Sequence, residues 1–322
     1  CHNSRMIVTL TLNTALDHVL FCDGFEWGRT IRAHASVLSV GCKGADVAWM
    51  LAELGQPVVA LGWTAGENGR RMEAMLRAQG VATDFVWVEG ETRLNTVLID
   101  TRRKVQSTVT AKGMQVRAEH VRAVKETLAR HLERASCLAI GGSLPPGVAP
   151  DLYGELIEMA RARGVPTILD ASGEGLRAGV QARPNVVKPN RDELQEWLGR
   201  PLPSLADVRH AAAEMVARGV DRVVVTLGKE GALAVSSTQA HFVPALDVPV
   251  VNTAGAGDGF VAGLCIMFQE NLSWTEGLRW GAAIAAAVVL MPGTADCRRE
   301  DVLRFLPQIR CEEMALPQSE RA

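Results

Sequence analysis

From Val250 to Gly263 the sequence reads VVNTAGAGDGFVAG, a Gly-rich turn followed by the start of an amphipathic helix. Glycines before a helix let successive backbone N–H groups converge on an anion at the positive end of the helix dipole. A carboxylate there, Asp258, is well placed to take a proton from a hydroxyl that attacks a phosphoryl group. Asp is also a favoured helix cap, so a plain capping role fits Asp258 equally well on this stretch alone.

Upstream of this turn, short β-branched runs alternate with longer helical patterns. The expected buried strands are residues 7–12, 58–62, 137–140, 167–170, 185–187 and 222–227, and the expected helices are 44–54, 69–79, 118–133, 151–163 and 205–218. Downstream, 259–269 and 274–291 are expected to be two long helices. The alternation predicts an α/β fold of three layers, with helices on both faces of a mostly parallel central sheet.

Two regions interrupt the alternation. Residues 19–40 contain β-formers and few helix signals, while 94–99 and 105–110 flank a polar turn at Arg102-Arg103-Lys104 and indicate a hairpin. We expect these pieces to form a small β lid, with segments at about 14–40 and 92–112, on a single domain spanning 6–312. Residues 313–322 are expected to be a flexible tail.

Composition excludes several classes of function. The formal net charge is −2, and Lys and Arg are spread along the chain, which argues against a nucleic-acid partner or a membrane anchor. The apolar run 282–291 is about half of the roughly 20 residues that cross a bilayer. Seven cysteines without a C-x-x-C pair predict reduced thiols, and we expect a cytoplasmic protein.

Six further motifs occur along the chain. They are TLNTALD from Thr11 to Asp17, GCKGADVA from Gly41 to Ala48, GETRLNT from Gly90 to Thr96, GGSLPPG from Gly141 to Gly147, KPNRDE from Lys188 to Glu193, and TLGKEG from Thr226 to Gly231. Each has an ordinary structural explanation when it is taken alone: a turn, a solvated charge or a helix start with acidic residues in its first turn.

Taken in this order, the motifs resemble those of the PfkB branch of the ribokinase family, closest to the 1-phosphofructokinase and tagatose-6-phosphate kinase subgroup, over nearly all of residues 6–306. The resemblance implies a ribokinase-like fold, ATP and Mg²⁺ as cofactors, and a homodimer formed through the lid. It also implies that Asp258 is the catalytic base.

The same resemblance assigns the remaining site residues. An anion hole would be formed by the backbone amides of Ala254, Gly255, Ala256 and Gly257. Substrate would contact Asp17, Gly41, Lys43, Asp46, Arg93, Asn95 and Ser143. Nucleotide would contact Lys188, Asn190, Thr226, Gly228 and Gly231, and Glu193 would lie near the water shell of Mg²⁺.

Three departures from the family pattern bear on specificity. Cys42 replaces a Gly, Asp46 replaces the Asn that ordinarily contacts sugar hydroxyls, and Met291 stands where an Asn is frequent. A carboxylate lacks the two donors of an amide and adds a negative charge. The sequence therefore does not determine which sugar is the substrate, nor whether the protein responds to a monovalent cation.

Three functions follow from these residues. Lys43 and Arg93 together favour a substrate that already bears a phosphate, because Arg can grip phosphate with two parallel hydrogen bonds. A kinase of an unphosphorylated sugar or nucleoside is the alternative. A sugar-phosphate sensor without catalysis is the alternative of another class. A nicotinamide dehydrogenase and a P-loop kinase are disfavoured, since neither G-x-G-x-x-G after the first strand nor a Walker A motif occurs.

Overall fold

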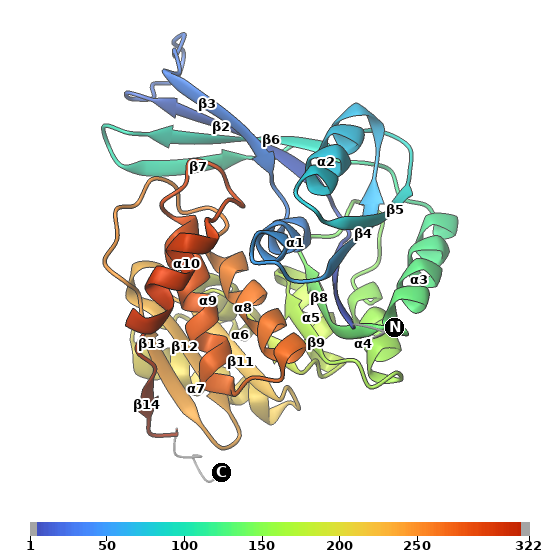
Figure 1. Ribbon diagram of the computed structural model, residues 1–322, viewed down its shortest axis with the longest axis vertical. Helices are drawn as coiled ribbons and strands as arrows, with labels where there is room; N and C mark the ends of the chain where they lie inside the picture. Colours follow the sequence, from blue (N-terminus) through green and yellow to red (C-terminus); the bar gives the residue numbers. More distant parts are fainter. Residues whose placement is uncertain (1–4, 317–322) are drawn as a thin grey trace.

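We describe residues 5–316 of the protein from a computed structural model, which contains a ten-stranded and a four-stranded sheet (Figure 1). In spatial order the large sheet comprises β14 (Glu312–Met314), β13 (Ala240–Pro244), β12 (Gly231–Ser236), β11 (Arg222–Thr226), β10 (Val186–Val187), β9 (Thr167–Asp170), β8 (Ala135–Gly141), β1 (Met6–Thr11), β4 (Val58–Thr64) and β5 (Ala82–Trp87). The strands from β11 to β5 are parallel, whereas β12, β13 and β14 pair antiparallel.

Helices cover both faces of the large sheet. One face packs against α1 (Lys43–Glu53), α2 (Gly66–Ala78), α8 (Ala256–Glu270), α9 (Trp274–Val288) and α10 (Arg299–Phe305). The other packs against α3 (Ala118–Leu132), α4 (Leu152–Arg161), α5 (Gly173–Gln181), α6 (Arg191–Leu198) and α7 (Leu205–Ala217). Along β1, Ile7 faces the first core while Val8 and Leu10 face the second. Burial on both faces explains why the central strands read as continuous apolar runs.

The small sheet is the lid, and it projects from the top left of the molecule in Figure 1. Its strands, in spatial order, are β3 (Ala35–Val40), β2 (Ala15–Cys22), β6 (Arg93–Asp100) and β7 (Val105–Val109). Val19, Phe21, Val97 and Ile99 form a small apolar cluster of its own. Since β2 follows β1 and β6 follows β5, the lid stands at the carboxyl ends of the large sheet's parallel strands.

The three-layer α/β architecture with a mostly parallel sheet and a small β lid is confirmed. Elements that the pattern did not indicate are β5, β12, β13, β14, α5 and α10. Glu313 and Met314, which were expected in a tail, belong to β14 and pair with β13. The rest of the expected tail, from 317 onward, lies outside the described residues.

Two further observations concern membrane-spanning helices and cysteines. Among residues 5–316, none of the helices is both long and apolar enough to cross a membrane. The cysteines of the described part of the chain are free thiols.

Candidate functional site

The sequence motifs meet at the carboxyl end of the central strands. A small pocket there is lined by Lys43 and Gly44 from α1, Gly141 from the end of β8, Asp170 from the end of β9, and Asp258 from α8. In α/β sheets the crevice outside the carboxyl ends of the strands is where ligands bind. Residues from four distant parts of the chain are thus brought to one point.

A buried carboxylate, Asp170, organises the cations of this pocket. Its two oxygens pair with Lys43 Nζ at 2.5 Å and Lys188 Nζ at 3.1 Å, and only 2% of its side chain is exposed. Although burial favours the neutral acid, Lys188 and Lys43 lower the pKa of Asp170, so it stays ionised. Glu193 Oε1 lies 3.6 Å from Lys43 Nζ and extends the network.

The same carboxylates keep the Lys43 side chain protonated. Burial by itself would lower the pKa of Lys43, but Asp170, Glu193 and Asp258 raise it above its ordinary value. Lys43 and Arg93, the two cations proposed to hold one phosphate, have different partners: Lys43 pairs with Asp170 and Glu193, whereas Arg93 donates to the main-chain oxygen of Asn13.

Asp258 lies in the first turn of α8 with 8% of its surface exposed. Burial is the main reason that its pKa rises to about 7, and the nearby Asp170 carboxylate adds to the effect. Lys43 and Lys188 oppose the rise. A carboxylate with a pKa near neutrality can accept a proton at physiological pH and release it again, which is the property of a general base.

The Gly-rich turn before α8 has a backbone that requires glycine. Gly255 has φ 82°, and a Cβ added there would collide with the main-chain oxygen of Thr294. The Ala254 N–H donates to Asn252 Oδ1 at 2.9 Å, so this amide is already occupied. The Ala256 N–H makes one long bond, 3.5 Å, to the Thr253 carbonyl oxygen, and the Gly255 and Gly257 N–H groups have no hydrogen-bond partner among the described residues. These three amides are therefore the candidate anion hole, because the first N–H groups of a helix have no partner within it.

On the lid side, β2 and β6 bring Asp17 and Asn95 together. Asn95 Nδ2 donates to Asp17 Oδ1 at 2.9 Å, and both residues are buried. Burial raises the pKa of Asp17 to about 6, although Asn95 and Arg93 lower it. A Cβ on Gly41 would collide with the Asp17 carboxylate, so only Gly lets the chain pass this close.

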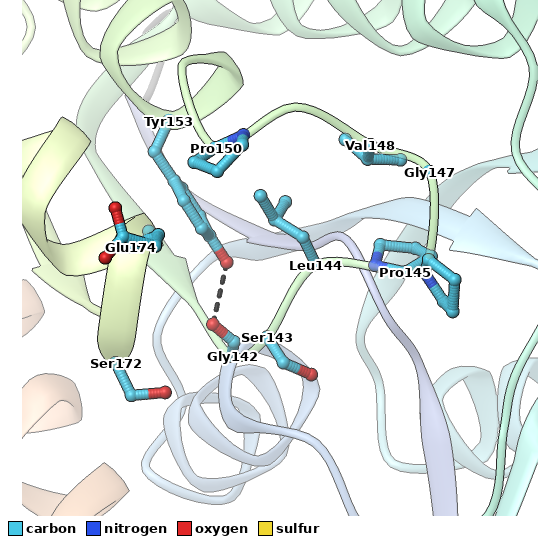
Figure 2. A pocket seen from close by; sticks show the side chains of 12 residues that line it. Gly142, Ser143, Leu144, Pro145, Gly147, Val148, Pro150, Tyr153, Ser172 and Glu174 are labelled. Carbon is cyan, nitrogen blue, oxygen red and sulfur yellow. Dashed lines mark hydrogen bonds between the residues drawn. The ribbon is translucent and has the colours of Figure 1, made fainter.

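Arg93 and Ser143 meet through a residue that the motif analysis did not single out, Asn13. Arg93 Nη2 donates to the Asn13 carbonyl oxygen at 2.6 Å, and Asn13 Nδ2 donates to Ser143 Oγ at 3.1 Å. Ser143 also lines a cavity of about 280 Å³, together with Leu144 and Tyr153 (Figure 2).

Asp46, the departure from the family pattern, is buried on α1. Its Oδ1 accepts the Cys42 N–H at 3.2 Å. Burial first, and then the carboxylates of Asp258 and Asp17, raise the pKa of Asp46 well above its ordinary range. Asp46 therefore belongs to the same buried acidic group as the two other candidate carboxylates.

The nucleotide-side motifs form tight structures at the next strand ends. Asn190 caps α6: the Glu193 N–H donates to Asn190 Oδ1, and the Asn190 N–H donates to Glu193 Oε2, each at 2.8 Å. Thr226 ends β11 beside Asn190. Gly228 and Gly231, with φ 59° and 116°, bound the short turn η1 (Gly228–Glu230) that leads into β12.

Sequence reasoning missed Asp170 and Asn13. For Asp170 a signal was available, because the expected strand 167–170 ends in Asp and the next strand is followed by Lys188, so opposite charges terminate neighbouring strands. Asn13 lies inside the TLNTALD motif, but nothing in the sequence joins it to Arg93 and Ser143.

The carboxylates of the site are also the candidate ligands for Mg²⁺. In the described part of the chain, no three His, Cys, Asp or Glu side chains gather to hold a metal by themselves. Mg²⁺ commonly keeps several waters and binds one or two carboxylates together with substrate phosphates. Glu193, with 15% of its side chain exposed, fits that partial role, whereas both oxygens of Asp170 are already paired with lysines.

Comparison with known proteins now identifies the class. Residues 8–301 match the model of the pfkB family of carbohydrate kinases, so the chain belongs to this family. The protein is therefore a kinase that phosphorylates a carbohydrate.

The relatives narrow this class to kinases of sugar phosphates. The chain is 37% identical over 299 residues to the 1-phosphofructokinase of Haloferax volcanii, covering 92% of this chain and 95% of the relative. It is 36% identical over 287 residues to that of Escherichia coli K12, covering 89% and 91%.

Solved structures that resemble the chain are also phosphofructokinases. Phosphofructokinase-2 from E. coli, crystallised with potassium, has a TM-score of 0.87 at 32% identity over 94% of this chain and 99% of that one. A possible 1-phosphofructokinase from Thermotoga maritima has a TM-score of 0.88 at 27% identity, over 96% and 100%.

Proposed function

We propose that the protein transfers the γ-phosphoryl group of ATP to a primary hydroxyl of a hexose phosphate, with fructose 1-phosphate as the first candidate. The observation that carries the proposal is the pocket in which Asp258, the turn before α8 and the Lys43–Asp170–Lys188 network meet. The names of the curated relatives favour the 1-phosphofructokinase reaction.

Asp258 is proposed as the general base. Its carboxylate takes the proton of the attacking hydroxyl as that oxygen bonds to phosphorus and the bond to the leaving ADP oxygen breaks. The amides of Gly255, Ala256 and Gly257 stabilise the charge on the transferred group, since such fixed donors need no reorganisation during reaction. Lys43 and Lys188 add positive charge beside Asp258.

The sugar phosphate is proposed to lie between the lid and the pocket. Asp17, Asp46 and Asn95 face the hydroxyls, with Gly41 allowing close approach. Arg93 and Ser143 hold the phosphate already present on the sugar. Lys43, which is paired with Asp170 and Glu193, is proposed to lie near the transferred phosphoryl group and to attract the substrate phosphate through longer-range electrostatics.

ATP is proposed to extend along the strand ends marked by Lys188, Asn190, Thr226, Gly228 and Gly231. Mg²⁺, held by nucleotide phosphates and by Glu193 through water, would neutralise phosphate charge. Cytoplasmic location is part of the proposal, because ATP and sugar phosphates are available there.

A coupled ADP-release assay tests this function. Fructose 1-phosphate, fructose 6-phosphate and tagatose 6-phosphate are compared with free ketohexoses and nucleosides. We expect turnover on at least one hexose phosphate and far lower kcat/KM on its unphosphorylated sugar. Equal turnover on the free sugar would favour the alternative kinase, and tight sugar-phosphate binding without ADP release would favour the sensor.

We also propose a homodimer formed through the lid. The edge strand β7 exposes Val105 and Val109 at 55% and 57%, and the β2–β3 connection exposes Trp27 at 88%. Exposed edge strands tend to be paired or covered. A second copy of the lid would cover these side chains.

A further inference from the structure

Asn13 joins two groups that the proposed function assigns to the substrate phosphate. Its main-chain oxygen accepts from Arg93 Nη2 at 2.6 Å, and its side-chain Nδ2 donates to Ser143 Oγ at 3.1 Å. Asn13 is only 7% exposed and lies in the turn between β1 and β2. One residue thus connects the first residue of β6 with the loop after β8.

These two hydrogen bonds determine which atoms stay free. Because Ser143 Oγ accepts from Asn13, its own O–H is directed elsewhere and remains available to donate. Arg93 uses Nη2 for the Asn13 carbonyl, and its Nε–H is buried without a partner among the described residues. The Nη1 group, which makes no hydrogen bond to those residues, is left to meet a ligand. Two unused donors, one of them charged, are the groups that suit a phosphate oxygen.

The position of Asn13 is itself tightly fixed. A Cβ on Gly113 would lie 2.9 Å from Asn13 Oδ1 and 2.9 Å from Arg93 Cγ, so the chain returning from the lid packs against both side chains. On the far side of the Ser143 loop, Tyr153 Oη donates to the Gly142 carbonyl at 2.7 Å (Figure 2). The loop is therefore held on both sides.

We propose that Asn13 is a positioning residue, which directs the Ser143 hydroxyl and the Arg93 guanidinium together toward the phosphate of the sugar substrate. This inference rests on the proposed function and goes beyond it, since Asn13 does not need to touch substrate. The side chain acts through Ser143, whereas the main-chain oxygen acts on Arg93 and is unaffected by substitution.

The test is a double-mutant cycle between Asn13→Ala and Ser143→Ala, with KM measured for the preferred hexose phosphate. A hydrogen bond that orients a donor to a charged group predicts a rise in KM of about tenfold for Asn13→Ala. We expect kcat and the KM for ATP to change less than about twofold. In the Ser143→Ala background, Asn13→Ala should have almost no further effect, because its acceptor is gone.

Asn13→Asp adds a second, nearly isosteric variant. A carboxylate can only accept, so Ser143 would donate to it and turn its proton away from the substrate, while the new charge repels phosphate. We expect a larger rise in KM than for Asn13→Ala, by about a further tenfold. Activity on an unphosphorylated sugar should change little in either variant.

Asn185→Ala is the matched control. Asn185 also bonds side chain to side chain, with Asp221 at 2.8 Å, but it directly precedes β10 and so lies at the amino end of the parallel strands, opposite the site. It should leave KM unchanged. If Asn13→Ala and Ser143→Ala had additive effects on the KM for the hexose phosphate, or if the KM for ATP rose equally, the positioning role of Asn13 would be wrong while the proposed function would stand. If the wild-type enzyme had the same kcat/KM for the phosphorylated and the unphosphorylated sugar, the proposed function itself would be wrong.

Discussion

Asp258 combines burial, neighbouring charge and a helix N-terminus, and the proposed chemistry depends on its carboxylate. We predict that Asp258→Asn lowers kcat by at least about a thousandfold, because the amide cannot take the proton of the attacking hydroxyl. Nucleotide affinity should be largely retained, since the amides of the turn and Lys188 are untouched. Single-turnover assays and calorimetry with an ATP analogue measure the two quantities, and substantial residual turnover would contradict the assignment of the base.

The pKa of Asp258, raised to about 7 mainly by burial, predicts a pH dependence of activity. Below this pH the base becomes protonated, so kcat/KM should fall as pH decreases from 8 to 6. A profile that stays flat down to pH 5 would mean that the base titrates elsewhere.

The same shift predicts the opposite trend for folding stability. Asp258 and Asp17 have folded pKa values of about 7 and 6, above the ordinary 3.8, so the folded protein binds more protons between these limits. The free energy of unfolding of the ligand-free enzyme gains from these groups below pH 4 and loses that gain as pH rises to 7. Asp258→Asn should weaken this trend in chemical denaturation series between pH 5 and pH 8.

At the scale of elements, the turn before α8 places the amides of the candidate anion hole. Gly255→Ala must both hold a positive φ, which costs about 1–2 kcal/mol, and displace the Thr294 main chain. We predict a drop in kcat of at least about a hundredfold and a clear loss of thermal stability.

Gly199→Ala is a matched control for that substitution. Gly199 has φ 72° at the end of α6, and a Cβ there meets nothing within 4 Å. It should cost about 1–2 kcal/mol of stability without affecting kcat. Equal kcat values for the two variants would show that the turn does not serve the reaction.

Most elements could be predicted from sequence where apolar period and flanking turns agreed, as for the strand 167–170 and the helix 118–133. The missed elements have other causes. The β14 strand is only three residues long, and α10 is only seven. The antiparallel pairing of β12 and β13 depends on neighbours in space rather than on the residues within each strand.

In the candidate site, too, residues close together in sequence could be predicted, whereas contacts between distant segments could not. Gly255 and Asp258 are only three positions apart in the sequence, so their motif could be recognised directly. The contact of Lys43 with Asp170 spans 127 residues, and that of Asn13 with Ser143 spans 130. Such contacts follow from the order of strands in the sheet, which no single motif contains. Asp170 and Asn13 were missed for this reason.

For the whole molecule, the exposed lid predicts the oligomeric state. The double variant Val105→Lys and Val109→Lys should convert the proposed dimer into a monomer, because charges would be buried where two lids meet. Leu303→Lys on α10, 46% exposed in the wild type, is the matched control and should leave the dimer intact. Sedimentation velocity measures the mass, and a monomeric wild type at micromolar concentration would contradict the proposal.

The separation of the lid from the large sheet has a consequence for how such enzymes diversify. Asp17, Arg93 and Asn95 lie on lid strands, whereas Lys188, Asn190 and Thr226 lie at the ends of strands in the large sheet. In the proposed function, the first group selects the acceptor and the second handles the donor. Exchanging the lid between two family members should therefore transfer the part of the acceptor preference that Asp17, Arg93 and Asn95 carry, so that new sugars can be recruited while the apparatus for using ATP is inherited unchanged.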